Sequence, residues 1–437
     1  MTTSTSRARF AAVALAIGAA VTSVPATAAS AAPATLTLAS APAWIAPGGD
    51  LHLHVRLSGP TAGLLLRVSA HPAITSRTAF SDTLAGADAG RVVDDVSIAV
   101  AYLPRARNGE TIVPVGLQDP GEQRDVRRLA VEHTGVYPLT VSLSPPNADP
   151  VATIETWLVV AERALDTRLS FAWVWQLVGT PRTSDNEAQV RAAVDPDGRL
   201  GRAAQALDGA GNVPLSFVLG PETFQTWAGI ASRDTRAAAG LAEVRTAVAD
   251  ETRRQVLATP YVPLNLPSIA AAGMAGEFVR DLRVGADAIQ SVLGVLPDPR
   301  TVLLDPIDAA AIHVARDAFA QRLVVREEAV RPVAHVLTPA RQFGIESAGR
   351  VYPAAASSTF VDHLLDGPGS RAERAQRFLA GLSLIALEAP SIARGIVLAT
   401  PAEWNPDPNL TAMVLAGLRS NPFIHPTTLD GYFAAVP

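Results

Sequence analysis

The sequence predicts two domains of different fold class, an all-β sandwich followed by a (β/α) barrel. Between residues 35 and 165, short runs of alternating or β-branched residues are separated by turn residues, with about a dozen residues between strands. From residue 166 to residue 437, short apolar runs alternate with helical patterns, which indicates a parallel sheet. The length of this second region suits a barrel, and an open doubly wound sheet is the alternative.

The first region carries the strand signals of a sandwich. Residues 50–57, DLHLHVRL, alternate strictly after a Pro-Gly-Gly turn, and further runs lie at 63–68, 112–117, 137–143 and 153–160. The tyrosine of GVYPL at 135–139 resembles the one that begins a late strand of immunoglobulin-like domains, so we expect an immunoglobulin-like module at 35–165. The sequence has no cysteine, so hydrophobic packing alone must hold the sheets together.

The second region repeats a unit of buried strand, polar loop and helix. In its clearest copy the apolar run 255–259 stops at Pro260, and a polar loop with Tyr261 follows. Asn265 can cap the helix that then begins, with Pro267 in its first turn. No GxGxxG opens any of these helices, which weakens a nucleotide-binding interpretation. Other buried runs lie at 169–178, 213–219, 300–304, 322–325, 333–337 and 395–400.

The N-terminus has the three parts of a signal peptide. Arg7 and Arg9 form a basic segment, residues 10–21 a short apolar run, and residues 26–28 a small-residue cleavage site. We therefore expect residues 1–28 to be removed and the mature protein to be secreted or otherwise extracytoplasmic. No other window approaches about 18 uninterrupted apolar residues, so no membrane span is expected in the mature chain.

Composition excludes several kinds of chemistry. The net charge of −5 and the lack of a basic block argue against nucleic acid as a partner. Every basic residue is an arginine, which excludes Schiff-base lysine chemistry, and the lack of cysteine excludes a thiol nucleophile. The eight histidines form no HxxxH or HExxH motif, and His52 and His54 share a strand face without a third ligand nearby. We expect no metal and no cofactor.

Polar and aromatic residues follow the ends of the predicted barrel strands, which is where parallel barrels meet their ligands. Carboxylates interleaved with aromatic rings suit sugars, because rings stack on C–H faces and carboxylates bind hydroxyls. Asp305 and Glu403 are the candidate carboxylate pair of a glycosidase, which needs a separation of about 5–5.5 Å for retention or about 6.5–9.5 Å for inversion. The full rim consists of Trp175, Gln176, Glu222, Tyr261, Asn265, Asp305, Arg326, Glu327, Glu403 and Trp404.

Structural roles account for the same residues. Asp305 precedes Pro306 with Asp308 three residues later, which is the pattern of a helix N-cap, a proline at the first helical position and an acid in the first turn. Glu222 follows Gly-Pro and fits a first-turn acid of the next helix. Residues 405–407 form a turn and cap pattern beside Glu403. The tryptophans and tyrosines fit a barrel core equally well.

Several segments together resemble an uncharacterised exported actinobacterial cell-envelope family. The resemblance covers most of the mature chain and depends on the order of the motifs. Relatives usually carry Asp where this chain has Asn265. The matching segments are VLATPY at 256–261, GVYPLTVSL at 135–143, FVLGPETFQTW at 217–227, IVLATPAEWNPDP at 396–408 and SNPFIHPTTLDGYF at 420–433.

The resemblance implies an immunoglobulin-like module joined to a barrel of the glycoside hydrolase or polysaccharide deacetylase type, working in the cell envelope. The adjacent aspartates and HxxxH of the deacetylases are not matched, and the glycosidase pair is matched only by the positions of Asp305 and Glu403. We therefore expect a non-catalytic barrel that binds cell-wall glycan or a protein partner such as an envelope membrane protein. The alternatives are an active glycoside hydrolase on an envelope polysaccharide and a scaffold whose sandwich makes the contacts.

Overall fold

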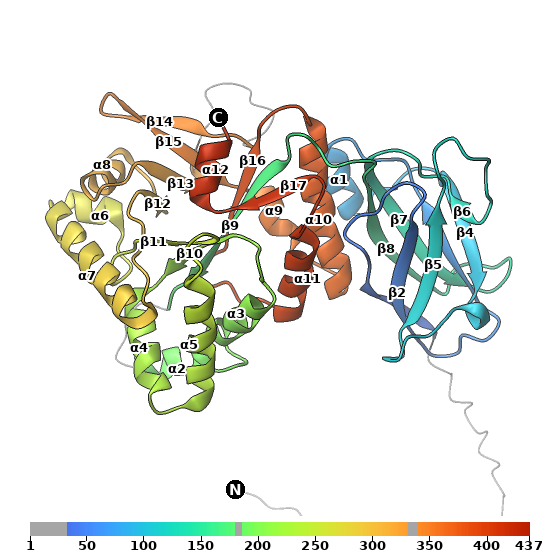
Figure 1. Cartoon of the computed structure of the whole chain (residues 1–437), viewed down its shortest axis with the longest axis horizontal. Coiled ribbons are helices and arrows are strands. Elements are labelled where there is room, and N and C mark those ends of the chain that lie inside the picture. The colour runs from blue at the N-terminus through green and yellow to red at the C-terminus, as the bar shows by residue number, and fades with distance from the viewer. Residues whose placement is uncertain (1–32, 180–185, 331–339) are drawn as a thin grey trace, which may run out of the picture.

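The computed structural model describes residues 33–179, 186–330 and 340–437. The predicted signal peptide at 1–28 and the predicted strand at 333–337 therefore lie outside the described residues. Among the residues described, no helix combines the length and the apolarity needed to cross a bilayer. A β-sheet lobe forms one end of the molecule and a helix-covered sheet forms the other (Figure 1).

The N-terminal lobe contains, within the described residues, two four-stranded sheets that share one core. Alternate residues of each strand enter this core, such as Leu51 and Leu53 from one sheet and Val141 and Leu143 from the other. This is the arrangement of a β-sandwich, and its immunoglobulin-like classification stays a prediction. In spatial order, the strands of the first sheet are β1 (Thr35–Ser40), β2 (Asp50–Ser58), β5 (Thr111–Leu117) and β6 (Arg128–Leu129). The strands of the second sheet are β4 (Asp94–Ala99), β3 (Leu65–Ala70), β7 (Gly135–Ser144) and β8 (Ala152–Val160).

The C-terminal lobe is built on a mostly parallel sheet that nearly closes on itself. Leu257 of β11 forms a parallel bridge with Asp298, where the Ala258 amide donates to the Asp298 carbonyl at 2.9 Å, so the segment that leads into β12 contacts the other edge of the sheet. This closure favours the barrel over the open sheet. The strands follow the order β11 (Arg254–Leu257), β10 (Leu215–Leu219), β9 (Leu169–Leu177), β16 (Gly395–Ala399), β15 (Arg350–Ser357), β13 (Arg322–Arg326), β12 (Thr301–Leu304), with β14 (Phe343–Ser347) beside β15 and β17 (Ile424–Thr427) beside β9.

The helices cover the outside of the barrel because its strands are apolar on both faces. In β9, Phe171, Trp173 and Trp175 pack into the core shared with the helices, whereas Ala172 and Val174 pack inside the barrel. The helices are α1 (Arg77–Leu84) in the sandwich lobe, then α2 (Asn186–Val194), α3 (Arg199–Asp208), α4 (Pro221–Ala231), α5 (Thr235–Val248), α6 (Leu266–Ala271), α7 (Ala275–Leu293), α8 (Ala309–Asp317), α9 (Thr359–Leu364), α10 (Arg371–Glu388), α11 (Pro408–Leu418) and α12 (Leu429–Ala435).

The C-terminal helix α12 closes the amino end of the barrel. Leu429 and Tyr432 pack among the inward side chains of the strands. The Leu429 amide donates to Ser216 Oγ at 2.9 Å and the Asp430 amide to Gln255 Oε1 at 2.9 Å, and both acceptors lie near the starts of their strands. The barrel interior is therefore filled from this end.

Helix α10 joins the two lobes. Ala372 belongs to the sandwich core, whereas Phe378 packs against Phe171 of the barrel with ring centroids 5.8 Å apart. The Gln376 amide donates to the carbonyls of Ala41 and Pro42 at 2.9 and 3.0 Å. The same contact surface includes a stacked pair from the sandwich lobe, Phe80 and Trp157, at 4.1 Å. The lobes are thus packed through a continuous apolar interface.

Because α12 closes the barrel, shortening a single one of its buried side chains should lower the stability of the protein markedly. Leu429→Ala should lower the free energy of unfolding by about 2–5 kcal/mol, because it leaves a void among fully buried side chains. The same substitution at exposed Leu296, which is 70% accessible, should change it by less than about 0.5 kcal/mol. Urea unfolding followed by circular dichroism measures both, and equal effects would contradict the closing role of α12.

Candidate functional site

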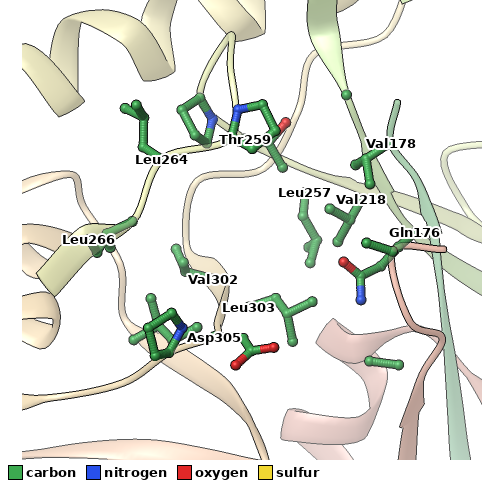
Figure 2. A pocket seen from close by; sticks show the side chains of 18 of the residues that line it. Gln176, Val178, Val218, Leu257, Thr259, Leu264, Leu266, Val302, Leu303 and Asp305 are labelled. Atoms are coloured by element: carbon green, nitrogen blue, oxygen red, sulfur yellow. The ribbon is translucent and has the colours of Figure 1, made fainter. Parts of the chain in front are cut away.

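The carboxyl ends of the barrel strands surround a cavity of about 370 Å³. This is the end of a parallel barrel at which ligands bind, and the volume lies in the range of about 300–1,000 Å³ that is usual for small-molecule sites. Figure 2 shows the Asp305 carboxylate and the Gln176 amide pointing toward the same space. Each of seven strands contributes a lining residue near its end: Gln176, Val218, Leu257, Leu303, Arg326, Ser357 and Ala399.

The lining of the cavity has an apolar side and a polar side. The apolar side consists of Leu264, Leu266, Phe278, Leu282 and Val302, from the loop after β11, α6, α7 and β12. The polar side consists of Gln176, Ser357 and Glu403, from β9, β15 and the turn after β16, the strand between them. Asp305 and Arg326 lie beside the apolar side at the ends of β12 and β13. In Figure 2, Leu264, Leu266 and Val302 lie across the cavity from Gln176. The charged side chains of Asp305 and Arg326 are exposed, at 45% and 46%, whereas Phe278 is buried.

Asp305 is held by a neighbouring strand end and not by its own helix. It directly follows β12, and its carboxylate accepts a hydrogen bond from Arg326 Nε at the end of β13. This contact raises the pKa of Arg326. Helix α8 is capped by Asp308, whose carboxylate accepts from the Ala311 amide at 2.6 Å. The predicted capping role of Asp305 is therefore wrong, because the helix begins three residues later than the Asp-Pro pair indicated.

Glu403 lies on a turn after β16 that Arg199 fixes in place. The Arg199 guanidinium donates to the Ala402 carbonyl at 3.1 Å and also to the Val178 carbonyl, which ties the turn to the end of β9. Burial lowers the pKa of Arg199, and the charge of Glu403 opposes this shift. The predicted cap beside Glu403 is confirmed, since Asp407 accepts from the amides at the start of α11. Glu403 itself remains exposed at the cavity.

A second cavity of about 300 Å³ lies on the other side of Glu403, which lines both. Trp404 is half-buried there, with its ring against Trp175 at 4.9 Å. Burial raises the pKa of Asp362, and the neighbouring charge of Asp366 raises it further. The cavity thus combines an aromatic ring with charged and amide groups; its polar lining residues include Asp362, Asp366, Arg374, Asn405 and Asp407.

The other predicted ligand-binding residues lie elsewhere. Among the described residues, those lining the barrel cavity do not include Trp175, Glu222, Tyr261, Asn265 or Trp404. Trp175 is fully buried because its side of β9 faces the helices, so the prediction that it contacts ligand is wrong.

Glu222 is buried in the first turn of α4, as its alternative interpretation predicted. The Tyr261 hydroxyl donates to Gln225 Oε1 of α4 at 2.7 Å. Asn265 caps α6 by accepting from the Ser268 amide at 2.9 Å, and this capping prediction is confirmed.

Other lining residues were missed by the sequence analysis. Ser357 ends β15, a strand that was not predicted because its run of alanines carries little β-propensity. Phe278 and Leu282 project from α7, and only their helical spacing of four residues indicated a shared buried face. Nothing in the sequence showed that this face borders a cavity.

The histidines form no metal centre in the part of the chain that the structure describes. Across residues 33–179, 186–330 and 340–437, no group of three or more His, Asp or Glu side chains could hold a metal ion. His54 lies 3.4 Å from Glu110 on the sandwich sheet. Asp362 and His363 lie side by side in sequence on the short helix α9.

Comparison with known proteins gives distant structural matches. No protein-family model and no curated protein matches the chain. A 4-α-glucanotransferase from Thermococcus litoralis matches at 10% identity and TM-score 0.46, covering 61% of this chain and 38% of its own. An α-amylase from Thermotoga maritima matches at 9% identity and TM-score 0.44, covering 62% of this chain and 75% of its own. A putative polysaccharide deacetylase from Mycobacterium smegmatis matches at 12% identity and TM-score 0.39, covering 62% of this chain and 90% of its own.

The matched proteins are thus a glucanotransferase, an amylase and a putative polysaccharide deacetylase, and the chain spans little more than a third of the glucanotransferase's length. Similarity at this level identifies no activity for the chain. The chemistry of the cavity must therefore be argued from its own residues.

We expect substitutions of the two neighbouring aspartates, Asp305 and Asp308, to have different effects on stability. Asp308→Ala should lower the free energy of unfolding by about 0.5–2 kcal/mol, the usual cost of losing an N-cap. Asp305→Ala removes only an exposed ion pair and should cost at most about 1 kcal/mol. Thermal unfolding of both variants checks this order, and the reverse order would restore the capping role of Asp305.

Because the pKa of Asp362 is raised, replacing this residue with a neutral one should stabilise the protein by an amount that depends on pH. The folded protein binds this proton more tightly than the unfolded chain, so stability falls as the pH rises through the unfolded pKa, and the loss is complete above the folded pKa. Asp362→Asn should raise Tm at pH 7, and the gain should fade as the pH falls toward about 4, where unfolded aspartate titrates. Exposed Asp287→Asn is the matched control. A gain that is independent of pH would contradict the argument.

Proposed function

We propose that the protein binds a saccharide at the carboxyl end of its barrel without hydrolysing it. The observation that carries this is a pair of cavities that both have Glu403 in their lining. One offers the exposed polar groups of Asp305, Arg326 and Glu403, and the other offers a half-exposed tryptophan ring among carboxylates and an amide. Hydroxyl groups of a saccharide match such mixed donors and acceptors, and a ring face matches a tryptophan.

The surroundings of the two carboxylates favour binding over hydrolysis. A glycosidase needs one carboxyl that keeps its proton at neutral pH, which proteins achieve by placing it in an apolar pocket. Asp305 is bonded to Arg326, and Glu403 lies close enough to Arg199 to influence its pKa. Both carboxylates are exposed. Neither side chain has the buried, apolar environment that distinguishes a general acid.

Export and a role in the cell envelope form part of this proposal. They are supported by the basic, apolar and small-residue segments of residues 1–28 and by the resemblance of the mature chain to exported envelope proteins. The ligand would then be a cell-wall glycan, with the immunoglobulin-like module alongside. A protein partner in the envelope is the other occupant that this location allows.

Hydrolysis is the second candidate function, and one observation favours it. Asp305 and Glu403 line the same cavity, and Asp305 is not used to cap a helix. An enzyme would employ them as the carboxylate pair on an envelope polysaccharide.

Binding and product release separate the two functions. The mature protein should be retained on insoluble peptidoglycan or arabinogalactan without releasing sugars. Glu403→Gln should weaken retention about tenfold or more, since a hydrogen bond to a charged group contributes about 1.5–3 kcal/mol. Glu243→Gln, on the exposed face of α5, is the matched control. Release of sugars by the unchanged protein but not by Glu403→Gln would instead establish hydrolysis. If the protein is retained on neither polymer, both glycan functions fail and a role as a scaffold remains.

A further inference from the structure

The apolar side of the barrel cavity presents surface that a saccharide alone would not use. Leu264, Leu266 and Val302 line the cavity and are only half-buried, so part of each apolar side chain is accessible to an occupant. A bare sugar placed against this side would lose water from its hydroxyl groups without gaining hydrogen bonds in return. The lining therefore calls for an occupant that is itself partly apolar.

The two sides of the cavity are arranged for a molecule with two chemically different ends. Leu264, Leu266 and Val302 lie across the space from Gln176 (Figure 2), whereas Glu403 also lines the second cavity, which contains Trp404. The opposite, amino end of the barrel is filled by Leu429 and Tyr432. An apolar chain can enter from the polar side but cannot pass through the barrel, so its length is limited.

We propose that the ligand is an alkyl- or acyl-linked saccharide, whose chain occupies the apolar side while its sugar lies at Glu403. This inference rests on the proposed saccharide binding and adds the chemical class of the ligand. The chain would displace water from apolar walls, which is the main source of affinity for such a group. The sugar would keep its hydrogen bonds at the polar side.

A homologous series of n-alkyl β-D-glucosides tests the chain directly. Titration calorimetry of the mature protein, below the concentrations at which these glucosides form micelles, should show affinity rising about fourfold per added methylene, the equivalent of about 0.8 kcal/mol per buried CH₂. The rise should stop once the apolar side is filled. An affinity that does not depend on chain length would overturn the inference.

Two variants test the contact with the alkyl chain of the ligand separately from the contact with its sugar. Leu264→Asn, at a half-exposed loop position, should weaken the binding of octyl glucoside about tenfold, because a polar amide then faces the alkyl chain, and circular dichroism checks that the variant is folded. Leu296→Asn, which is exposed and outside the cavity, should have no effect. Equal binding by both variants would place the chain elsewhere and contradict the proposal.

Glu403→Gln should weaken every glucoside by the same factor and leave the slope against chain length unchanged. If n-alkanols of equal length bind as tightly as the glucosides and Glu403→Gln has no effect, the saccharide proposal fails while the chain site stands. If soluble cell-wall saccharides bind but chain length has no influence, the saccharide proposal stands and the chain site fails.

Discussion

The need of a parallel barrel strand to bury both of its faces governs this structure, and β9 meets that need along nearly all of its nine residues. Its two sets of alternate side chains enter separate cores, one shared with the helices and one inside the barrel. β9 also pairs with β10, β16 and β17, so it fixes the position of three other strands. The orientation of β9 decides that Gln176 faces the cavity and that Trp175 does not.

The parallel register transfers this constraint to the site. Leu304 of β12 pairs with Val325 of β13, so the residues that follow them, Asp305 and Arg326, emerge side by side at the same end of the barrel. Their ion pair is therefore a consequence of strand alignment. Glu403 reaches the same end on the turn after β16, where Arg199 connects it to β9. The charged groups thus come from segments far apart in sequence and are brought to one end of the barrel by the sheet, with Arg199 of α3 holding the turn of Glu403.

Local patterns were sufficient to predict most barrel strands and the carboxyl-end location of the site. Apolar runs ending at a proline or a polar turn marked β10, β12 and β16 closely. Which face of an all-apolar strand points inward could not be predicted, because both faces look alike in sequence, and Trp175 was misassigned for that reason. The choice between Asp305 and Asp308 as cap also escaped prediction, since either residue type suits the position. The alanine-rich β15 gave no strand signal at all.

Helix α10 has a consequence for how the molecule comes apart. Ala372 contributes to the sandwich core while Phe378 contributes to the barrel core, and Gln376 bonds to the chain that leaves β1. The boundary near residue 165 therefore separates two folds but not two units of stability. Unfolding either lobe would expose apolar surface of the other, which couples the two into one cooperative transition. A barrel produced without its sandwich would lack one wall of its own core.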